Sequence, residues 1–150
     1  MQKVFRNRNG DVLNVKQHTL DILNECPNVK IHIGTDSQNF KRKTIYVSVI
    51  AYRMGNSGVH CIYHKIKEKK NKDKWSRLWK EAIMTMEIAE WLSEKINVNI
   101  EVDFDFNGDA NHYSYRLISA AQGMATASGF KSNVKPYNQV ATWAADMACK

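Results

Sequence analysis

The sequence predicts a mixed α/β fold: a five-stranded sheet, in which three antiparallel strands are followed by crossover strands, flanked by helices. Two observations carry this prediction. Short segments rich in β-branched and aromatic residues are typical of strands, and longer segments with apolar residues at i, i+3, i+4 and i+7 are typical of helices. In the second half of the chain the two kinds of segment alternate, which is the order that produces crossovers between strands.

The first half of the chain is expected to contain one helix and three strands. An apolar stripe predicts a helix over Val12–Cys26, and Pro27 ends it. The next apolar run alternates in polarity and ends in a carboxylate at Asp36. A turn at Met54–Gly58 joins the two runs that follow as a hairpin. The expected strands are Lys30–Asp36, Thr44–Arg53 and Val59–Lys67.

The second half is expected to alternate helices and strands. Its clearest helix is Trp75–Ile96, in which apolar residues cover one face. Gly129 suits the left-handed position that commonly ends a helix. The remaining expected elements are a strand at Val98–Phe106, a helix at Tyr115–Ala127, a short strand at Lys131–Lys135 and a helix at Gln139–Cys149.

Length and composition indicate a single domain over residues 1–150, with residues 1–28 as an N-terminal helical extension. A chain of 150 residues buries enough surface to fold without a disulfide or metal staple. It has no run of the roughly 20 apolar residues that cross a membrane, and residues 1–6 lack the apolar segment expected of a signal peptide. The three cysteines Cys26, Cys61 and Cys149 are an odd number without metal-ligand spacing. Since no export signal is seen either, we expect a cytoplasmic protein with no membrane partner.

The net charge of +7 is unevenly distributed and favours a polyanionic partner. Clustered Lys and Arg side chains attract the phosphates of nucleic acids. The alternative is a solvated loop and helix face. We expect Lys70, Lys72 and Lys74 to contact substrate, because they lead into the helix that carries Glu81. The main basic run is Lys65, Lys67, Lys69, Lys70, Lys72, Lys74, Arg77 and Lys80, and smaller groups are Arg6 with Arg8 and Lys41 with Arg42 and Lys43.

Four acidic residues fall in predicted elements in the order strand, helix, strand, helix. They are Asp36, Glu81, Asp105 and Asp146. Asp103 lies two residues before Asp105, on the same face of its strand. Taken singly, each acid has an ordinary structural explanation, but several carboxylates beside apolar segments are costly to bury without a positive partner. A hard divalent cation held by oxygens, Mg²⁺ or Mn²⁺, is the simplest common partner.

Short motifs surround these acids. Asp36 lies in Ile33-Gly34-Thr35-Asp36-Ser37-Gln38, Glu81 opens the helical segment Glu81–Leu92, Glu101–Asn107 ends a strand, and Ala144-Ala145-Asp146 lies near the C-terminus. In this order the motifs resemble the ribonuclease H fold, and more closely the YkuK-like family of bacterial and phage RNase H-related nucleases. The resemblance covers about Phe5 to Lys150. It implies an RNase H-like sheet and the cytosol of a bacterium or a phage-infected host.

The resemblance further implies a hydrolase that cleaves the RNA strand of an RNA–DNA hybrid, or structured nucleic acid, by a two-metal-ion carboxylate mechanism. Asp36 is expected to bridge two Mg²⁺ or Mn²⁺ ions. Glu81 and Asp105 are expected on one ion and Asp146 on the other, with Asp103 as a substitute for Asp105 or an additional ligand. Further substrate contacts are expected from Ser37, Gln38 and Lys135.

Two other functions use the same fold. A non-catalytic nucleic-acid-binding module would keep the fold and the basic surface without turnover, and metal-dependent cleavage distinguishes it from a nuclease. An actin-like phosphotransferase is disfavoured, because the chain has room for one such domain and contains no Gly-rich phosphate loop.

Overall fold

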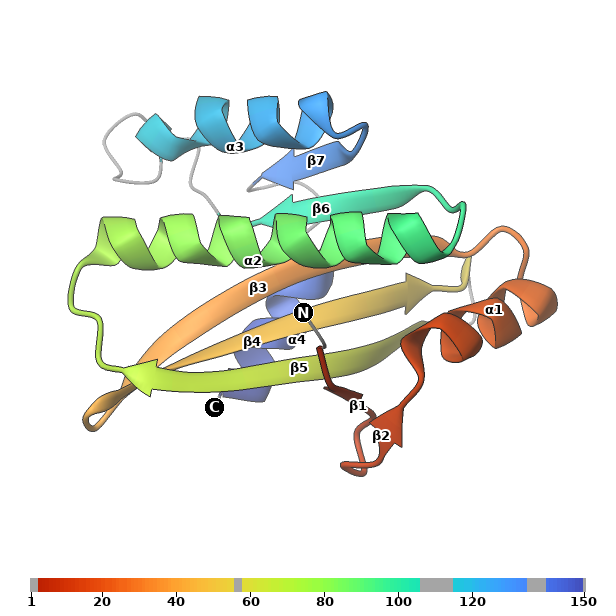
Figure 1. Ribbon diagram of the computed structural model, residues 1–150, viewed down its shortest axis with the longest axis horizontal. Helices are drawn as coiled ribbons and strands as arrows, with labels where there is room; N and C mark the ends of the chain where they lie inside the picture. Colours follow the sequence, from red (N-terminus) through yellow and green to blue (C-terminus); the bar gives the residue numbers. More distant parts are fainter. Residues whose placement is uncertain (1–2, 56–57, 106–114, 135–139, 150) are drawn as a thin grey trace.

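The computed structural model describes residues 3–55, 58–105, 115–134 and 140–149 (Figure 1). Within these residues the strands form one mixed sheet in the order β2-β1-β5-β4-β3-β6-β7. The strands are β1 Phe5–Arg6, β2 Val12–Leu13, β3 Lys30–Phe40, β4 Lys43–Arg53, β5 Val59–Lys69, β6 Ile100–Phe104 and β7 Lys131–Val134. The helices are α1 Val15–Glu25, α2 Lys74–Lys95, α3 Tyr115–Ala127 and α4 Val140–Cys149.

Three long antiparallel strands are followed by two parallel ones, as the sequence predicts. β4 pairs with β3 on one side and with β5 on the other. β6 lies parallel to β3, and β7 lies parallel to β6. Helix α2 leads from β5 to β6 and α3 from β6 to β7, and Gly129 adopts the left-handed conformation after α3, with a φ of +83°. The mixed α/β class is therefore confirmed.

The prediction of five strands is wrong, because the described sheet has the two additional N-terminal strands β1 and β2. Each contains two residues, too few to show an alternating pattern. They form through tertiary pairing: Arg6 pairs with Tyr63 of β5 and with Val12 of β2. Val12 is therefore a strand residue, and α1 begins only after Asn14, whose side chain accepts a hydrogen bond from the backbone of Gln17. The N-terminal extension is only partly helical.

β3 continues four residues beyond its predicted end at Asp36. The apolar pattern stops at Asp36, but main-chain pairing with β4 continues as far as Phe40 and Lys43. Main-chain hydrogen bonds do not require apolar side chains, which is why the sequence pattern missed this extension. Asp36 consequently lies inside a strand, and β6 ends at Phe104, one residue before Asp105. Three predicted element ends lie outside the described residues: Phe106, Lys135 and Gln139.

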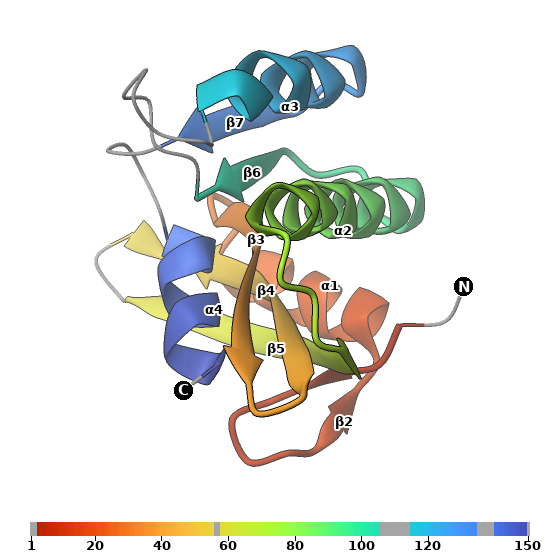
Figure 2. The ribbon, with the colours of Figure 1, turned by 90° about the vertical axis from the view of Figure 1, so that its left-hand side faces the viewer.

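Helices cover both faces of the sheet (Figure 2). Helices α1, α2 and α3 contribute to the larger core on one face, where Ile33, Ile50 and Leu92 are fully buried. Helix α4 packs on the opposite face, against β3 and β4, over Val47 and Val49. None of the described helices is both long and apolar enough to cross a membrane.

Helix α4 approaches β3 closely because small residues meet where the two elements cross. A Cβ atom added at Gly34 would lie 2.9 Å from Cγ2 of Thr142 and 3.0 Å from Cβ of Ala141. Both distances are shorter than ordinary van der Waals contact. Ala145, one turn further along α4, is also fully buried. The missing side chain at Gly34 therefore sets the distance between α4 and the sheet, and with it the position of Asp146.

Gly34→Ala is expected to lower the free energy of unfolding by about 1–3 kcal/mol, because the added methyl group must displace α4. Urea denaturation measures the change. Gly123→Ala in α3 is the matched control, because a Cβ there meets no atom within 4 Å and alanine favours a helix by up to about 1 kcal/mol. Unchanged stability of Gly34→Ala would show that α4 does not depend on this contact.

Candidate active site

Four carboxylates from four different elements lie in one region of the molecule. Asp36 is in β3, Glu81 is two turns into α2, Asp105 directly follows β6, and Asp146 is in α4. These four residues are called the carboxylate cluster below. Asp36 and Glu81 are 9% and 6% exposed, so water screens their charges poorly.

The sheet and its two covering helices bring the cluster together. Gly34 pairs with Asp103 in the parallel ladder between β3 and β6, so Asp36 and Asp105, each two residues further along, lie level with each other. Helix α2 crosses β3 on one face and buries Glu81, whereas α4 crosses β3 on the other face and carries Asp146.

The cluster strongly favours the protonated form of Asp36. Burial is the main cause of a pKa raised from the ordinary value of 3.8 to about 7. A side-chain hydrogen bond with Asp146 and the negative charge of Asp105 raise this pKa further, and a backbone hydrogen bond from Ser37 lowers it. A central acid that is partly protonated near neutral pH indicates a site short of positive charge.

Glu81 is affected in the same way. Burial raises its pKa well above the ordinary value, and the charge of Asp36 is the second cause. The hydroxyl of Ser37 donates a hydrogen bond of 2.8 Å to Oε2 of Glu81, and both this bond and the charge of Arg77 lower the pKa. Asp105 raises it, so the acids of β3, α2 and the β6 end influence one another.

Ser37 and Gln38, which the sequence predicts as substrate contacts, hydrogen-bond the cluster. Ser37 binds Glu81, as described above, and Nε2 of Gln38 donates to Oδ1 of Asp146 at 3.3 Å. Successive residues of a strand point to opposite faces, so Ser37 contacts α2 and Gln38 contacts α4. The two residues after Asp36 therefore link the strand to both covering helices.

Cys149 belongs to the same surroundings, and sequence reasoning missed it. Its thiol donates a weak hydrogen bond to the backbone oxygen of Asp36 at 3.6 Å. Burial raises the pKa of Cys149 to about 12, and the charges of Asp36, Asp146 and Glu81 contribute. The available signal was its position three residues after Asp146, which places both residues on one side of α4.

Asp103 does not share this environment. It is 1% exposed, and its oxygens accept hydrogen bonds from Nδ2 of Asn133 at 2.9 Å and from the backbone N–H of Ala141 at 3.0 Å. Nδ1 of His32 lies 3.1 Å from Oδ1 of Asp103. Ala141 is in the first turn of α4, so Asp103 binds the start of the helix that carries Asp146. The structure places Asp105 with the cluster and Asp103 in a supporting network.

The cluster offers only oxygen donors, the chemistry that Mg²⁺ and Mn²⁺ prefer. Like charges crowded in a buried site also favour a cation, since it relieves their repulsion. Among the described residues, however, no three His, Cys, Asp or Glu side chains are arranged so that they could hold a metal ion as they stand. The donor set fits a divalent cation in chemistry, whereas binding in this arrangement requires the side chains to draw together.

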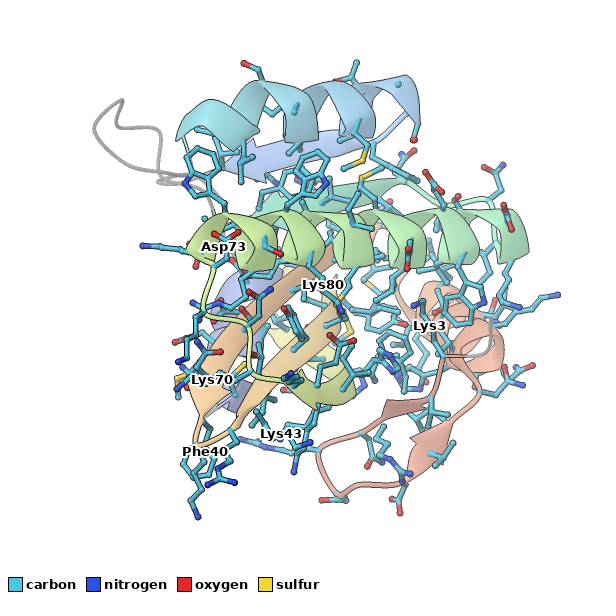
Figure 3. All side chains as sticks on the ribbon, turned by 60° about the vertical axis from the view of Figure 1, so that its left-hand side comes forward. Lys3, Phe40, Lys43, Lys70, Asp73 and Lys80 are labelled. Carbon is cyan, nitrogen blue, oxygen red and sulfur yellow. The ribbon has the colours of Figure 1, made fainter. Side chains whose placement is uncertain are left out.

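The predicted basic contacts lie on the segment that enters α2. Lys70, Lys72 and Lys74 are exposed. Asp73 begins the helix by accepting a hydrogen bond from the backbone of Trp75 at 3.2 Å. Figure 3 shows Lys70 and Lys43 at the same end of the molecule as Phe40. The fourth predicted contact, Lys135, lies outside the described residues.

Comparison with known proteins identifies one family. Residues 14–150 match a family model described as Ribonuclease H-like. The matched segment contains all four acids of the carboxylate cluster and begins directly after β2. No curated protein and no solved structure shows a significant match to the chain.

Asp36→Asn is expected to stabilise the metal-free protein at about pH 8 and to change little at about pH 4. Between 3.8 and about 7 the folded protein binds more protons than the unfolded chain, so its stability falls as pH rises. The variant avoids this loss, which is at most about 4 kcal/mol, because a tenfold change in an ionisation constant is worth about 1.4 kcal/mol.

Urea denaturation in EDTA at both pH values measures this effect. Glu94→Gln, at an exposed position of α2, is the charge-matched control. An equal effect of Asp36→Asn at the two pH values would contradict the raised pKa of Asp36.

Asp103→Asn is expected to lower the free energy of unfolding by about 1–3 kcal/mol, because an amide NH₂ then faces donors that the carboxylate satisfied. The same denaturation experiment measures it. Asp21→Asn on the exposed face of α1 is the control, since its remaining oxygen can still accept the hydrogen bond from Gln17. Equal stability of the two variants would argue against a supporting role for Asp103.

Proposed function

This chain belongs to the ribonuclease H-like family, and we propose that it is a metal-dependent nuclease that hydrolyses phosphodiester bonds of nucleic acid. The proposed substrate is the RNA strand of an RNA–DNA hybrid or another structured nucleic acid. One observation carries the proposal: burial, a hydrogen bond with Asp146 of α4 and the charge of Asp105 at the β6 end raise the pKa of Asp36 to about 7, and the charge of Asp36 in turn helps to raise the pKa of Glu81 in α2.

In this proposal Asp36, Glu81, Asp105 and Asp146 would together hold two Mg²⁺ or Mn²⁺ ions. When bound, such ions lower the pKa of an attacking water and offset the charge that develops on the phosphate. The support is the all-oxygen donor set and the crowding of negative charge around Asp36.

The chain's own residues would orient these ligands. The hydroxyl of Ser37 fixes one oxygen of Glu81, and the amide of Gln38 fixes one oxygen of Asp146. Asp103 binds the first turn of α4 and thereby positions Asp146 indirectly. Such outer contacts commonly change metal affinity or activity by 10- to 100-fold.

Positive charge beside the cluster would hold the substrate. Lys70, Lys72 and Lys74 are exposed on the segment that enters α2, two turns before Glu81. Together with Lys135 they are proposed to bind phosphates, which agrees with the net charge of +7. A cytoplasmic location, with bacterial or phage-infected host cytosol as the setting, is part of the same proposal, as is a single domain over residues 1–150.

A non-catalytic nucleic-acid-binding module is the second candidate. One observation favours it: the described residues hold no ready-made metal site. Such a protein would bind the same polyanionic partners through its basic surface without cleaving them.

Asp36→Asn and Glu81→Gln are each expected to reduce metal-dependent cleavage by at least about 100-fold, because each removes a metal ligand. The assay uses labelled RNA–DNA hybrid, duplex DNA, single strands and a four-way junction, each with Mg²⁺, Mn²⁺ or EDTA. Glu94→Gln, on the exposed side of α2, should retain full activity.

Undiminished cleavage by Asp36→Asn would overturn the assignment of the cluster. Binding without cleavage in every condition would identify the non-catalytic module instead.

A further inference from the structure

The end of the β3–β4 hairpin extends from the carboxylate cluster. Beyond Asp36, β3 stays paired with β4 up to Phe40 and Lys43, and the segment from Gln38 to Ile45 is called the hairpin arm below. Asp36, Gln38 and Phe40 lie on the same face of the strand, because every second residue points to the same side. At about 3.3 Å per residue, Phe40 lies about 13 Å along the strand from Asp36. A nucleic-acid strand with a rise of about 3.4 Å per nucleotide covers this distance in about four nucleotides.

The tip of the hairpin arm presents an aromatic ring beside positive charge. Phe40 is 60% exposed, and Nζ of Lys41 lies 5.4 Å from the centre of its ring. Lys41 has a φ of +56°, a conformation that is costly for residues other than glycine or asparagine. This conformation is the one that a two-residue turn between paired strands requires. Aromatic rings interleaved with Lys and Arg are the means by which proteins stack on bases while holding the phosphates.

Strand pairing adds a second basic segment to the tip. Lys43 pairs with Lys69, and the backbone N–H of Lys70 donates to the oxygen of Arg42 at 3.1 Å. The basic group at positions 41–43 and the run that enters α2 are therefore neighbours, although they are far apart in sequence (Figure 3). The basic side chains gathered here are all exposed: Lys41, Arg42, Lys43, Lys69 and Lys70.

A hydrogen-bond network around Thr44 holds the two segments together. Thr44 is fully buried and donates to the side-chain oxygen of Asn39, while its hydroxyl accepts from the backbone of Asn71 at 2.8 Å. Nδ2 of Asn39 donates to the backbone oxygen of Asn71 at 3.2 Å. Asn71 also binds Ser76 in the first turn of α2 at 3.1 Å. The arm is thereby fixed relative to the helix that carries Glu81, and it loses little freedom when a ligand binds.

We propose that the hairpin arm binds unpaired nucleotides of the nucleic acid, with Phe40 stacked on a base and Lys41, Arg42 and Lys43 on neighbouring phosphates. Bases inside a duplex have no free face for Phe40, so the preferred ligand carries a single-stranded stretch about four nucleotides from the phosphate that lies at Asp36. The inference rests on the nucleic-acid part of the proposed function and is independent of turnover.

The test measures binding by fluorescence anisotropy in EDTA, in an Asp36→Asn background, so that cleavage plays no part. The probes are a labelled single strand, the blunt duplex of the same sequence, and that duplex with a single-stranded overhang. Phe40→Leu should weaken binding of the single strand and the overhang by about 5- to 100-fold, with little effect on the blunt duplex. Phe40→Trp should retain the affinity.

Lys41→Gln combined with Arg42→Gln should reduce the slope of log K against log salt by about 1.4 for the single strand, because two phosphate contacts are lost. Phe40→Leu should leave this slope unchanged. Val12→Ala, at a position that is also 60% exposed, and Lys16→Gln, at an exposed position of α1, are the matched controls and should alter no affinity.

Unchanged affinities in Phe40→Leu, or equal weakening for single strand and blunt duplex, would overturn the inference. Loss of single-strand binding in Phe40→Leu, for a protein that cleaves none of the nuclease substrates, would establish the arm and reject the nuclease. Metal-dependent cleavage by a protein whose affinities do not change in Phe40→Leu would support the nuclease and reject the role of the hairpin arm.

Discussion

The contact between α4 and β3 at Gly34 is the constraint on which the candidate site depends. Asp36 and Asp105 lie level because their strands are paired, and α2 buries Glu81 through an extensive apolar core. Asp146 has no such support, because the core beneath α4 is small and rich in alanine. Its position follows from how closely α4 can approach the strand, which Gly34 permits and Asp103 reinforces at the start of the helix.

The same arrangement is electrostatically unfavourable without a cation. Burial raises the pKa of Asp36 and of Glu81, and neighbouring negative charge raises both further. The central antiparallel strands and the larger core must offset the free-energy cost of burying these like charges together. A ligand that brings positive charge to the folded state would stabilise it by mass action. A site that opposes folding until it is filled is expected where stability has been exchanged for function.

Much of the candidate site was predictable from the sequence, because each acid sits in a recognisable local motif. The choice between Asp103 and Asp105 was not, since both point to the same strand face. This choice depends on partners from distant segments. His32, Asn133 and Ala141 contact Asp103, whereas the charge of Asp105 raises the pKa of Asp36. Cys149 escaped notice because a thiol at the end of an apolar helix looks like any other core residue.

The sequence by itself determined the mixed α/β class, the order of the long strands and helices, and the family, because hydrophobic periodicity and short motifs are local properties. Only the tertiary structure decided the pairing of β1 and β2 and the continuation of β3 to Phe40. It also joined the basic group at positions 41–43 to the run that enters α2. These features arise from main-chain hydrogen bonds between strands, which leave no period in the side chains.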